Sequence, residues 1–407
     1  MISMLKLPFK SSSRNTKNFA CVEITSDYVR CLVLEPPVTV GENFRVLGVS
    51  KVAVEKVFVR AGLIIDAEHV SAAVKSAVLD AGKDVTHLSN EVIVSIAGEL
   101  SICNITTVKM TRPDNTPLKK KEINAIYSTT SQSSLENAAL LFMQTTGNVD
   151  SKMELILSSD VYFKLDGVVV EELENKKGTD LEIASFSSFS PKFNVSAVET
   201  VCKKAGLKLL GISPQLYGLT LMLKKLKGEY FDGVVINISS DFTEVGIIFG
   251  GGLVATKTLA IGSSHFTRVI SDRLGLPYKD AKLKKIQYIN ATLTSEDTLL
   301  LQETTSELLE LWLDGIQLLF EEFEGVKTFS SKVYITGEDI DFPGLIDILS
   351  KEPWTKSIAF KAPPEYIKVI CEDFTVINDT TGKCVGGEFA PLLGVCNVYL
   401  FLKGMVE

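Results

Sequence analysis

The chain has 407 residues, of which 45% are hydrophobic and 23% are charged, and these fractions are close to the average for a globular protein. The composition excludes a disordered, collagen-like or coiled-coil chain, and the length predicts about two to four domains. The formal net charge of -8 disfavours a nucleic-acid-binding protein, because neutralising phosphates requires a basic surface.

The cysteines and the apolar runs indicate the compartment. None of the seven cysteines forms a CxxC pair, so neither a disulfide framework nor a zinc ribbon is expected. A cytoplasmic location is the simpler interpretation, since thiols stay reduced there. No apolar run reaches about 18 residues, the length that predicts a bilayer-spanning helix.

Residues 1–18 are predicted to be a flexible tail. The tail contains a run of three serines, which is typical of a linker. It has four basic residues and no acidic residue: Lys6, Lys10, Arg14 and Lys17. The alternative is a weak membrane-surface or partner anchor, in which these cations act together with the apolar residues between Ile2 and Phe9.

A first domain is predicted over residues 19–97 and 179–211. It begins with strands at Phe19–Ile24 and Val29–Leu34, which are apolar or β-branched and flank a short polar turn. Asp66 is typical of a helix N-cap, because apolar residues at helical spacing follow it. Alternating strands and helices of this kind predict an α/β domain.

Residues 98–178 are predicted to be a small subdomain inserted into the first domain. The patterns there run strand, helix, strand, strand. The helix is expected at Leu118–Thr130, and the polar stretch 131–151 is expected to be a loop. The last two strands flank Asp166-Gly167, a dipeptide typical of a tight hairpin.

A second domain is predicted over residues 212–403, with a helical subdomain at about 264–326. Its first strands are expected within 232–262, where apolar and β-branched residues dominate. The two domains together give an α/β fold.

The strand–turn–strand unit occurs twice. Cys21–Tyr28 and Val235–Phe242 both contain the order Ile, hydroxyl residue, Ser, Asp, aromatic residue, about half the chain apart. A repeat over so long a period indicates two similar halves, and two α/β halves usually enclose a cleft where a ligand binds.

Six further stretches, taken in order, resemble segments of FtsA, a bacterial cell-division family of the actin superfamily. They are Gly62–Glu68, Val94–Gly98, Tyr162–Val170, Ile261–Thr267, Ala281–Lys285 and Val333–Leu345. The resemblance covers residues 19–402. It implies an actin-like (ribonuclease H-like) two-domain fold with a strand–helix–strand–strand subdomain inserted in the first half. PilM, a pilus-assembly family with its insertion at the same place, is the nearest alternative branch.

In this superfamily two hairpin turns and an adenosine loop bind a nucleotide with its magnesium ion. The resemblance therefore implies ATP and Mg²⁺ as cofactors, with Glu23 as the metal-facing carboxylate. The implied cofactor-binding residues are Glu23, Thr25, Ser26, Asn237, Ser239, Ser240, Thr243, Gly262, Ser263, Lys285, Gly337 and Glu338. No residue is assigned a catalytic role.

The sequence departs from the family pattern at the positions that would carry the chemistry. Thr25, Ser239 and Ser240 stand where the family has glycines. Asn237 replaces a metal-facing carboxylate with a neutral amide, and Asp241 adds a negative charge to a loop that should bind anions. Hydrolysis needs a positioned metal ion. ATP turnover is therefore not expected, and the fold is predicted to be a pseudo-ATPase scaffold.

The resemblance implies a cytoplasmic scaffold of a division assembly at the inner face of the cell membrane. Its partners would be a tubulin-like division protein or other divisome components, and its relatives' assembly through the insertion suggests a homo-oligomer. A PilM-like platform for type IV pilus or secretion assembly is one alternative, and an active actin-fold ATPase is the other. FtsA chains usually end in a membrane-binding helix after a linker. Here the last predicted helix leads directly into residues 401–407, so any peripheral membrane contact would fall to the N-terminal tail.

Overall fold

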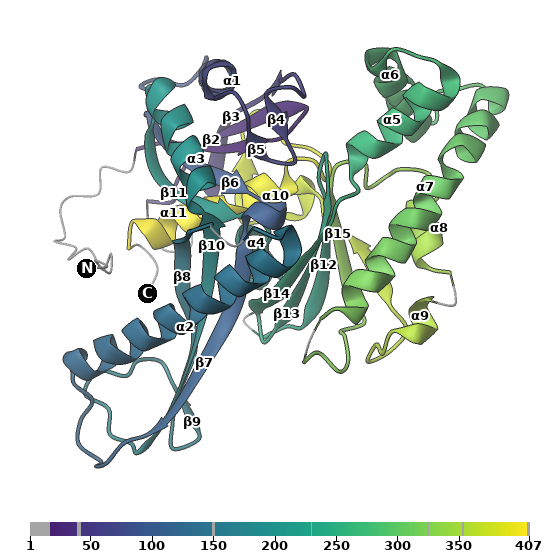
Figure 1. Ribbon diagram of the computed structural model, residues 1–407. Helices are drawn as coiled ribbons and strands as arrows, with labels where there is room; N and C mark the ends of the chain where they lie inside the picture. Colours follow the sequence, from purple (N-terminus) through teal and green to yellow (C-terminus); the bar gives the residue numbers. More distant parts are fainter. Residues whose placement is uncertain are drawn as a thin grey trace.

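The computed structural model describes residues 17–38, 42–148, 151–228, 230–323, 325–351 and 354–404. The predicted N-terminal tail and its expected membrane contact therefore lie almost entirely outside the described residues. Figure 1 shows two α/β lobes side by side, with an elongated insertion that projects from between them.

The first lobe is built on a six-stranded sheet with the order β11-β6-β1-β2-β3-β17. Helices α1 (Ala67–Ala81) and α3 (Lys192–Lys204) pack apolar side chains against one face of it. Asp66 caps α1 as predicted, accepting from the backbone N–H groups of Glu68 and His69. The strands are β1 (Phe19–Ile24), β2 (Tyr28–Glu35), β3 (Phe44–Ala53), β6 (Glu91–Ile96), β11 (Lys208–Pro214) and β17 (Ile377–Asp379), with a separate ribbon of β4 (Val59–Arg60) and β5 (Leu63–Ile64).

The second lobe is built on part of a nine-stranded sheet with the order β16-β15-β12-β13-β14-β7-β10-β8-β9. Its own strands are β12 (Gly233–Ile238), β13 (Thr243–Phe249), β14 (Gly252–Leu259), β15 (Lys332–Gly337) and β16 (Glu365–Lys368). One face is covered by helices that form an apolar core with it. They are α5 (Ser263–Leu274), α6 (Tyr278–Ile289), α7 (Ser295–Glu321), α8 (Leu345–Leu349) and α9 (Trp354–Ser357).

The strand order shows the internal repeat that the two hairpins predicted. In each sheet three consecutive antiparallel strands, β1-β2-β3 or β12-β13-β14, are followed on the side of the first strand by two parallel strands. The parallel strands are β6 and β11 in one lobe and β15 and β16 in the other. Both hairpins therefore lie at equivalent places in their sheets.

The insertion consists of β7 (Ile102–Thr111), α2 (Lys120–Thr146), β8 (Met153–Leu165), β9 (Val168–Val170) and β10 (Asp180–Pro191). Strand β7 pairs with β14 through Asn104 and Ala255, so the insertion extends the sheet of the second lobe. Strand β10 pairs along its length with β7 and β8. The predicted boundary at residue 178 therefore falls one strand before the end of the insertion's sheet.

The predicted loop at 131–151 is wrong, and so is the end of the helix at Thr130, because α2 continues to Thr146. The helix buries hydroxyl groups where an apolar periodicity is normally found. Thr130 and Ser134 are buried, and Ser134 hydrogen-bonds Thr106 on β7 at 2.5 Å. A polar seam of this kind conceals a helix from a search for apolar faces.

Two helices from distant parts of the chain pack between the lobes. They are α4 (Gln215–Lys227) and α10 (Ala390–Gly394), and α11 (Cys396–Leu402) follows. A Cβ at Gly218 would lie 2.7 Å from the Val395 Cα, and one at Gly394 would lie 2.7 Å from the Leu219 nitrogen. Only glycines allow this approach. No helix within the described ranges is long and apolar enough to cross a membrane.

Candidate functional site

The turns of the two hairpins meet between the lobes and bind each other. Thr25 closes its own turn, since its Oγ1 accepts from the Tyr28 N–H at 3.1 Å. The next residue, Ser26, donates its hydroxyl to the carboxylate of Asp241 in the second turn. Asp241 also accepts from the Ser264 hydroxyl at 3.2 Å. Hydrogen bonds within the chain therefore link the two turns at the place where the family resemblance implies phosphate groups.

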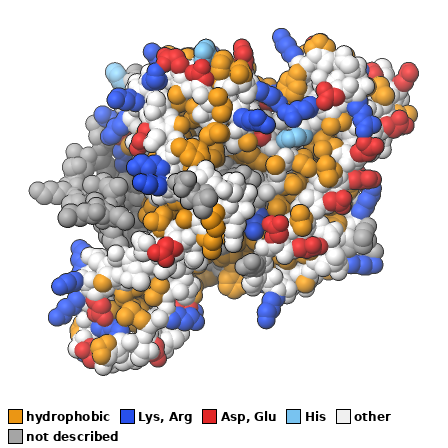
Figure 2. Space-filling view, viewed as in Figure 1, with side chains coloured by type: hydrophobic (Ala, Val, Ile, Leu, Met, Phe, Trp, Pro, Cys, Tyr) orange, Lys and Arg blue, Asp and Glu red, His pale blue; other side chains and the backbone are white. Residues whose placement is uncertain are grey.

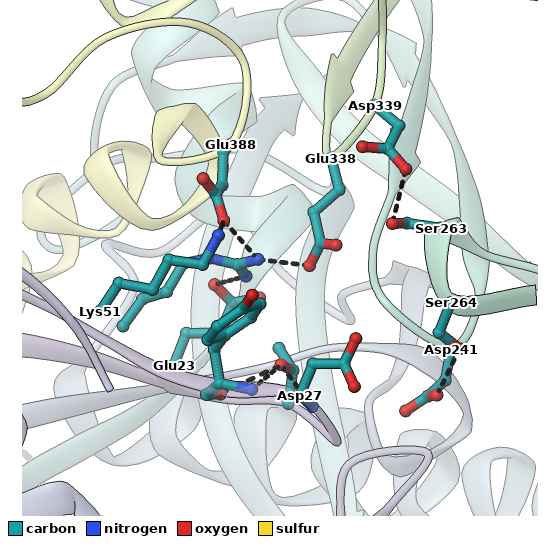
Figure 3. A network of polar contacts seen from close by, with 12 residues as sticks. Glu23, Asp27, Lys51, Asp241, Ser263, Ser264, Glu338, Asp339 and Glu388 are labelled. Carbon is teal, nitrogen blue, oxygen red and sulfur yellow. Dashed lines mark hydrogen bonds and ion pairs between the residues drawn. The ribbon is translucent and has the colours of Figure 1, made fainter. Parts of the chain in front are cut away.

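A buried arginine lies beside this contact. Arg30 on β2 is 1% exposed, and its guanidinium donates to Glu23 at 2.9 Å and to Glu338. Its Nε donates to Glu388 at 2.9 Å, and Lys51 pairs with the same carboxylate. The three carboxylates come from β1, from the loop after β15 and from the loop before α10, and Figure 3 shows Glu23, Glu338 and Glu388 turned toward one another. Arg30 thus joins the two lobes.

The charges of this network shift the pKa values of Arg30 and Glu388. Burial alone would lower the pKa of Arg30, but the carboxylates of Glu338, Glu23 and Glu388 raise it well above its ordinary value. For Glu388, burial acts to raise the pKa, and Arg30 with Lys51 outweighs it and lowers the pKa. Burying ions without partners is very costly, so the network is stable only while complete.

A second chain of hydrogen bonds continues from Glu23 into the second lobe. Gln215 at the start of α4 donates to Glu23 at 2.6 Å and accepts from Asn237 at 2.8 Å. Asn237 lies 3.4 Å from Glu244, which accepts from the Gly98 N–H at 2.7 Å. Burial raises the pKa of Glu244 to about 7. Both oxygens of Glu23 are thus used by protein donors, Arg30 and Gln215.

We expect Glu244→Gln to remove a loss of stability that the wild type shows between about pH 5 and pH 8. The folded pKa of about 7 lies above the unfolded value of about 4.3. The folded protein therefore binds more protons in this window, and its free energy of unfolding falls as the pH rises. The measurement is urea unfolding at about pH 5 and about pH 8. Between these pH values the free energy of unfolding of the variant, relative to that of the wild type, should rise by about 2–3 kcal/mol. Glu199→Gln, at an exposed position, is the control and should keep the pH dependence of the wild type. If the stability of Glu244→Gln changed with pH in parallel with the wild type, the raised pKa of Glu244 would be contradicted.

The remaining predicted residues lie around the second hairpin and the loop after β15. Lys285 donates to the Ser263 hydroxyl at 2.8 Å and to Asp339 at 2.6 Å. The Thr243 hydroxyl accepts a hydrogen bond from the Trp312 indole N–H at 2.9 Å, which links β13 to α7. Among the described residues, the buried hydroxyl of Ser240 has no hydrogen-bond partner. The contacts of Lys285 and Thr243 stabilise the loops around the second hairpin.

Gly262 and Gly337 allow the loops that contain them to pack directly against the end of β12. A Cβ at Gly262 would lie 2.4 Å from the Ser239 carbonyl oxygen, and one at Gly337 would lie 2.1 Å from the Ile238 carbonyl oxygen. The φ of Gly337 is +102°, a value that side chains disfavour. The Glu338 N–H then donates to the same Ile238 carbonyl at 2.6 Å, which directs Glu338 toward Arg30.

A further ion pair links the first hairpin to the helices of the second lobe. Asp27 in the first turn accepts from Lys282 on α6 at 2.9 Å and from the Tyr278 hydroxyl at 3.2 Å. Lys56 lies 3.6 Å from Asp27. Burial alone would raise the pKa of Asp27, and these two lysines lower it instead. The contact ties the first hairpin to the helical part of the second lobe.

The space that remains does not fit a nucleotide. The cavity between the hairpins has a volume of about 20 Å³ and is lined by Glu23, Thr25, Gln215, Ser239 and Asp241 among others. A ligand as large as a nucleotide needs a pocket of about 300–1,000 Å³, whereas a cavity of about 20 Å³ holds one water molecule. Within the described residues no three acidic, cysteine or histidine side chains are grouped to hold a metal ion. The residues present therefore do not fit Mg²⁺ and ATP in this arrangement.

Solved structures identify the architecture. The chain is similar to a chain of the PilM–PilN type IV pilus biogenesis complex, with 13% identity, a TM-score of 0.66, and coverage of 95% of this chain and 99% of that one. It is also similar to the ethanolamine utilization protein EutJ from Carboxydothermus hydrogenoformans, with 11% identity, a TM-score of 0.50, and coverage of 96% and 90%. The chain has the actin-like fold. No protein-family model and no curated protein sequence matches it.

The actin-like fold brings most of the predicted residues together at one cleft, as the repeat implied. Sequence reasoning missed Arg30, Gln215 and Glu388, which form the centre of the observed network. An arginine within an otherwise apolar strand was the one signal available, because a charge on a buried strand needs a partner. Nothing near it in sequence indicated that two of its three partners lie more than 300 residues away.

Proposed function

We propose that this chain is a non-catalytic actin-fold scaffold that acts through protein partners and does not use a bound nucleotide. The observation that carries the proposal is the guanidinium of Arg30, which joins Glu23, Glu338 and Glu388 across the cleft. It fills with fixed protein charges the region that a nucleotide-dependent member would keep open for Mg²⁺ and phosphates. The direct Ser26–Asp241 contact supports the same conclusion.

Among scaffolds, we favour a PilM-like platform of a type IV pilus or secretion assembly. The likeness to a chain of a PilM–PilN complex over nearly the whole length of both chains supports this choice. An FtsA-like role at a division assembly is the second candidate, supported by the six sequence stretches described above. In both cases the partners are proteins, and the assembly is membrane-associated.

The proposed function predicts that ATP will not bind to this chain. Titration calorimetry with ATP, with and without Mg²⁺, and with a non-hydrolysable analogue should give no binding heat up to millimolar nucleotide. Thermal unfolding should be unchanged, whereas a ligand at about a hundred times its Kd would add about 2.7 kcal/mol to the stability. Micromolar binding that is lost in Lys285→Met would instead restore the nucleotide site that the family resemblance implies.

The partner is identified by affinity purification of the tagged chain from membranes of its own organism, followed by mass spectrometry. Enrichment of a pilus-assembly membrane protein supports the platform. Enrichment of a tubulin-like division protein would favour the second candidate and reject the first. As a matched control, the exposed Leu79→Ser variant should retrieve the same proteins as the wild type.

A further inference from the structure

The longest helix of the second lobe has an unusual charge pattern. Helix α7 has 27 residues and contains no lysine or arginine. Its seven acidic residues are Glu296, Asp297, Glu303, Glu307, Glu310, Asp314 and Glu321. Asp297 and Glu307 form ion pairs with Lys284 and Arg273. Within the described part of the chain, Glu296, Glu303, Glu310 and Asp314 have no ion-pair partner.

A row of exposed leucines runs beside these carboxylates. Leu300, Leu311 and Leu318 are 42%, 57% and 54% exposed. Their spacings of 11 and 7 residues place them on one side of the helix, at 3.6 residues per turn. Glu303, Glu310 and Asp314 lie on the adjacent strip of the same exposed surface. The opposite side of α7 is buried in the core through residues such as Trp312 and Ile316.

This surface faces outward and is long. Figure 1 shows α7 on the outer side of the second lobe, and Figure 2 shows acidic side chains distributed over that region. From Leu300 to Leu318 the leucine row extends about 27 Å at 1.5 Å per residue. Below, "the α7 ledge" means Leu300, Leu311 and Leu318 with Glu303, Glu310 and Asp314. A binding partner for the ledge would combine apolar side chains with positive charge.

The chain itself contains a segment with that chemistry. Residues 1–16, outside the described ranges, include Lys6, Lys10 and Arg14 and no acidic residue. Six of the first nine residues have large apolar side chains: Met1, Ile2, Met4, Leu5, Leu7 and Phe9. The charge and the apolar content of this segment complement those of the α7 ledge.

Lys17, the first described residue after the segment, lies far from the ledge of its own copy. The carbonyl of Lys17 lies 3.5 Å from the Tyr399 hydroxyl of α11. Helices α11 and α7 lie on opposite sides of the molecule in Figure 1. A second copy can present its ledge to the segment without the chain having to pass around both lobes. The contact would be heterologous, with a different surface used on each copy.

We propose that residues 1–16 of one copy bind the α7 ledge of a second copy, so that copies associate head to tail. Each added copy leaves one free segment and one free ledge, so association continues beyond a dimer. The inference is independent of the proposed function, because the α7 ledge lies outside the cleft and its occupation does not depend on a nucleotide.

The test uses two full-length variants, each lacking one half of the contact. The segment variant is Lys6→Ser/Lys10→Ser/Arg14→Ser, and the ledge variant is Leu311→Ser/Leu318→Ser. In sedimentation velocity the wild type should show oligomers that grow with concentration. Each variant alone should remain monomeric, with association weakened at least tenfold. A one-to-one mixture should form dimers and nothing larger, because one complete contact is restored.

Controls separate the contact from general effects. Leu79→Ser removes an equally exposed leucine on α1 and should associate like the wild type, and 0.5 M NaCl should weaken association by screening. The proposal is overturned if the wild type is monomeric, or if either variant associates normally. It is also overturned if the segment variant loses only its binding to anionic lipid vesicles, since the segment would then be a membrane anchor. Mixing that fails to produce dimers would exclude the pairing of segment and ledge.

Discussion

Replacing Arg30 with methionine is expected to lower the free energy of unfolding by about 3–5 kcal/mol at pH 7. The substitution keeps an unbranched side chain about as long as the stem of arginine but removes the guanidinium. It leaves Glu23 and Glu338, which are 5% and 8% exposed, as buried carboxylates without their cation. Removing one member of a buried ion network is costly for this reason, even though the complete network contributes little net stability.

Urea unfolding of the wild type and Arg30→Met provides the measurement. Arg45→Met is the matched control, because Arg45 pairs with Glu35 on the surface, where the side chains are 51% and 37% exposed. A pair of that kind contributes about 0–1 kcal/mol. A loss below about 1 kcal/mol for Arg30→Met would show that the network does not hold the lobes together.

The pH dependence gives an independent check on the same variant. The lowered pKa of Glu388 means that its contribution to wild-type stability is present above its unfolded pKa and is lost as the pH falls through the folded one. In Arg30→Met this contribution is smaller, because Glu388 keeps only Lys51 as an ion-pair partner. The difference between wild type and variant should therefore be smaller at pH 4 than at pH 7. Adding Glu338→Gln to Arg30→Met should recover part of the stability, which a double-mutant cycle measures.

The sequence predicted the fold well where the pattern is local. The hairpin strands at Phe19–Ile24 and Val235–Ile238 are apolar and flank polar turns, so both were recognised as strands and as a repeat. The repeat then predicted two halves with a cleft, and the strand order of both sheets agrees with it. The pattern predicts the insertion in outline, but the predicted helix ends too early at Thr130, because Thr130 and Ser134 bury hydroxyl groups where apolar residues are expected.

The chemistry of the cleft could be predicted only in part. Thr25 and Ser239, which stand where the family has glycines, predict weaker phosphate binding, but they do not predict which contacts the two turns make. The cleft instead contains a set of contacts between distant residues, Arg30 with Glu338 and Glu388. Local periodicity contains no information about such pairs. Asp241, interpreted from sequence as a repulsive charge for an anion, is used in the fold as a hydrogen-bond acceptor for Ser26.

Gly337→Ala is expected to destabilise the protein by about 2–5 kcal/mol, although it adds only one methyl group. At φ +102° a side chain is strained, which costs about 1–2 kcal/mol. The added Cβ would also lie 2.1 Å from the Ile238 carbonyl oxygen, a backbone atom within β12 that cannot rotate away. Forcing such a contact apart costs about 1–3 kcal/mol more.

Gly382→Ala separates the two contributions. Gly382 also has a positive φ, +63°, but a Cβ there would meet nothing within 4 Å, so its substitution should cost only the strain of about 1–2 kcal/mol. Equal losses for the two variants in urea unfolding would show that the loop after β15 can move away from β12. The larger loss expected for Gly337→Ala would mean that this loop is fixed. A fixed loop keeps Glu338 against Arg30, so closure of the cleft is then built into the backbone as well as into its charges.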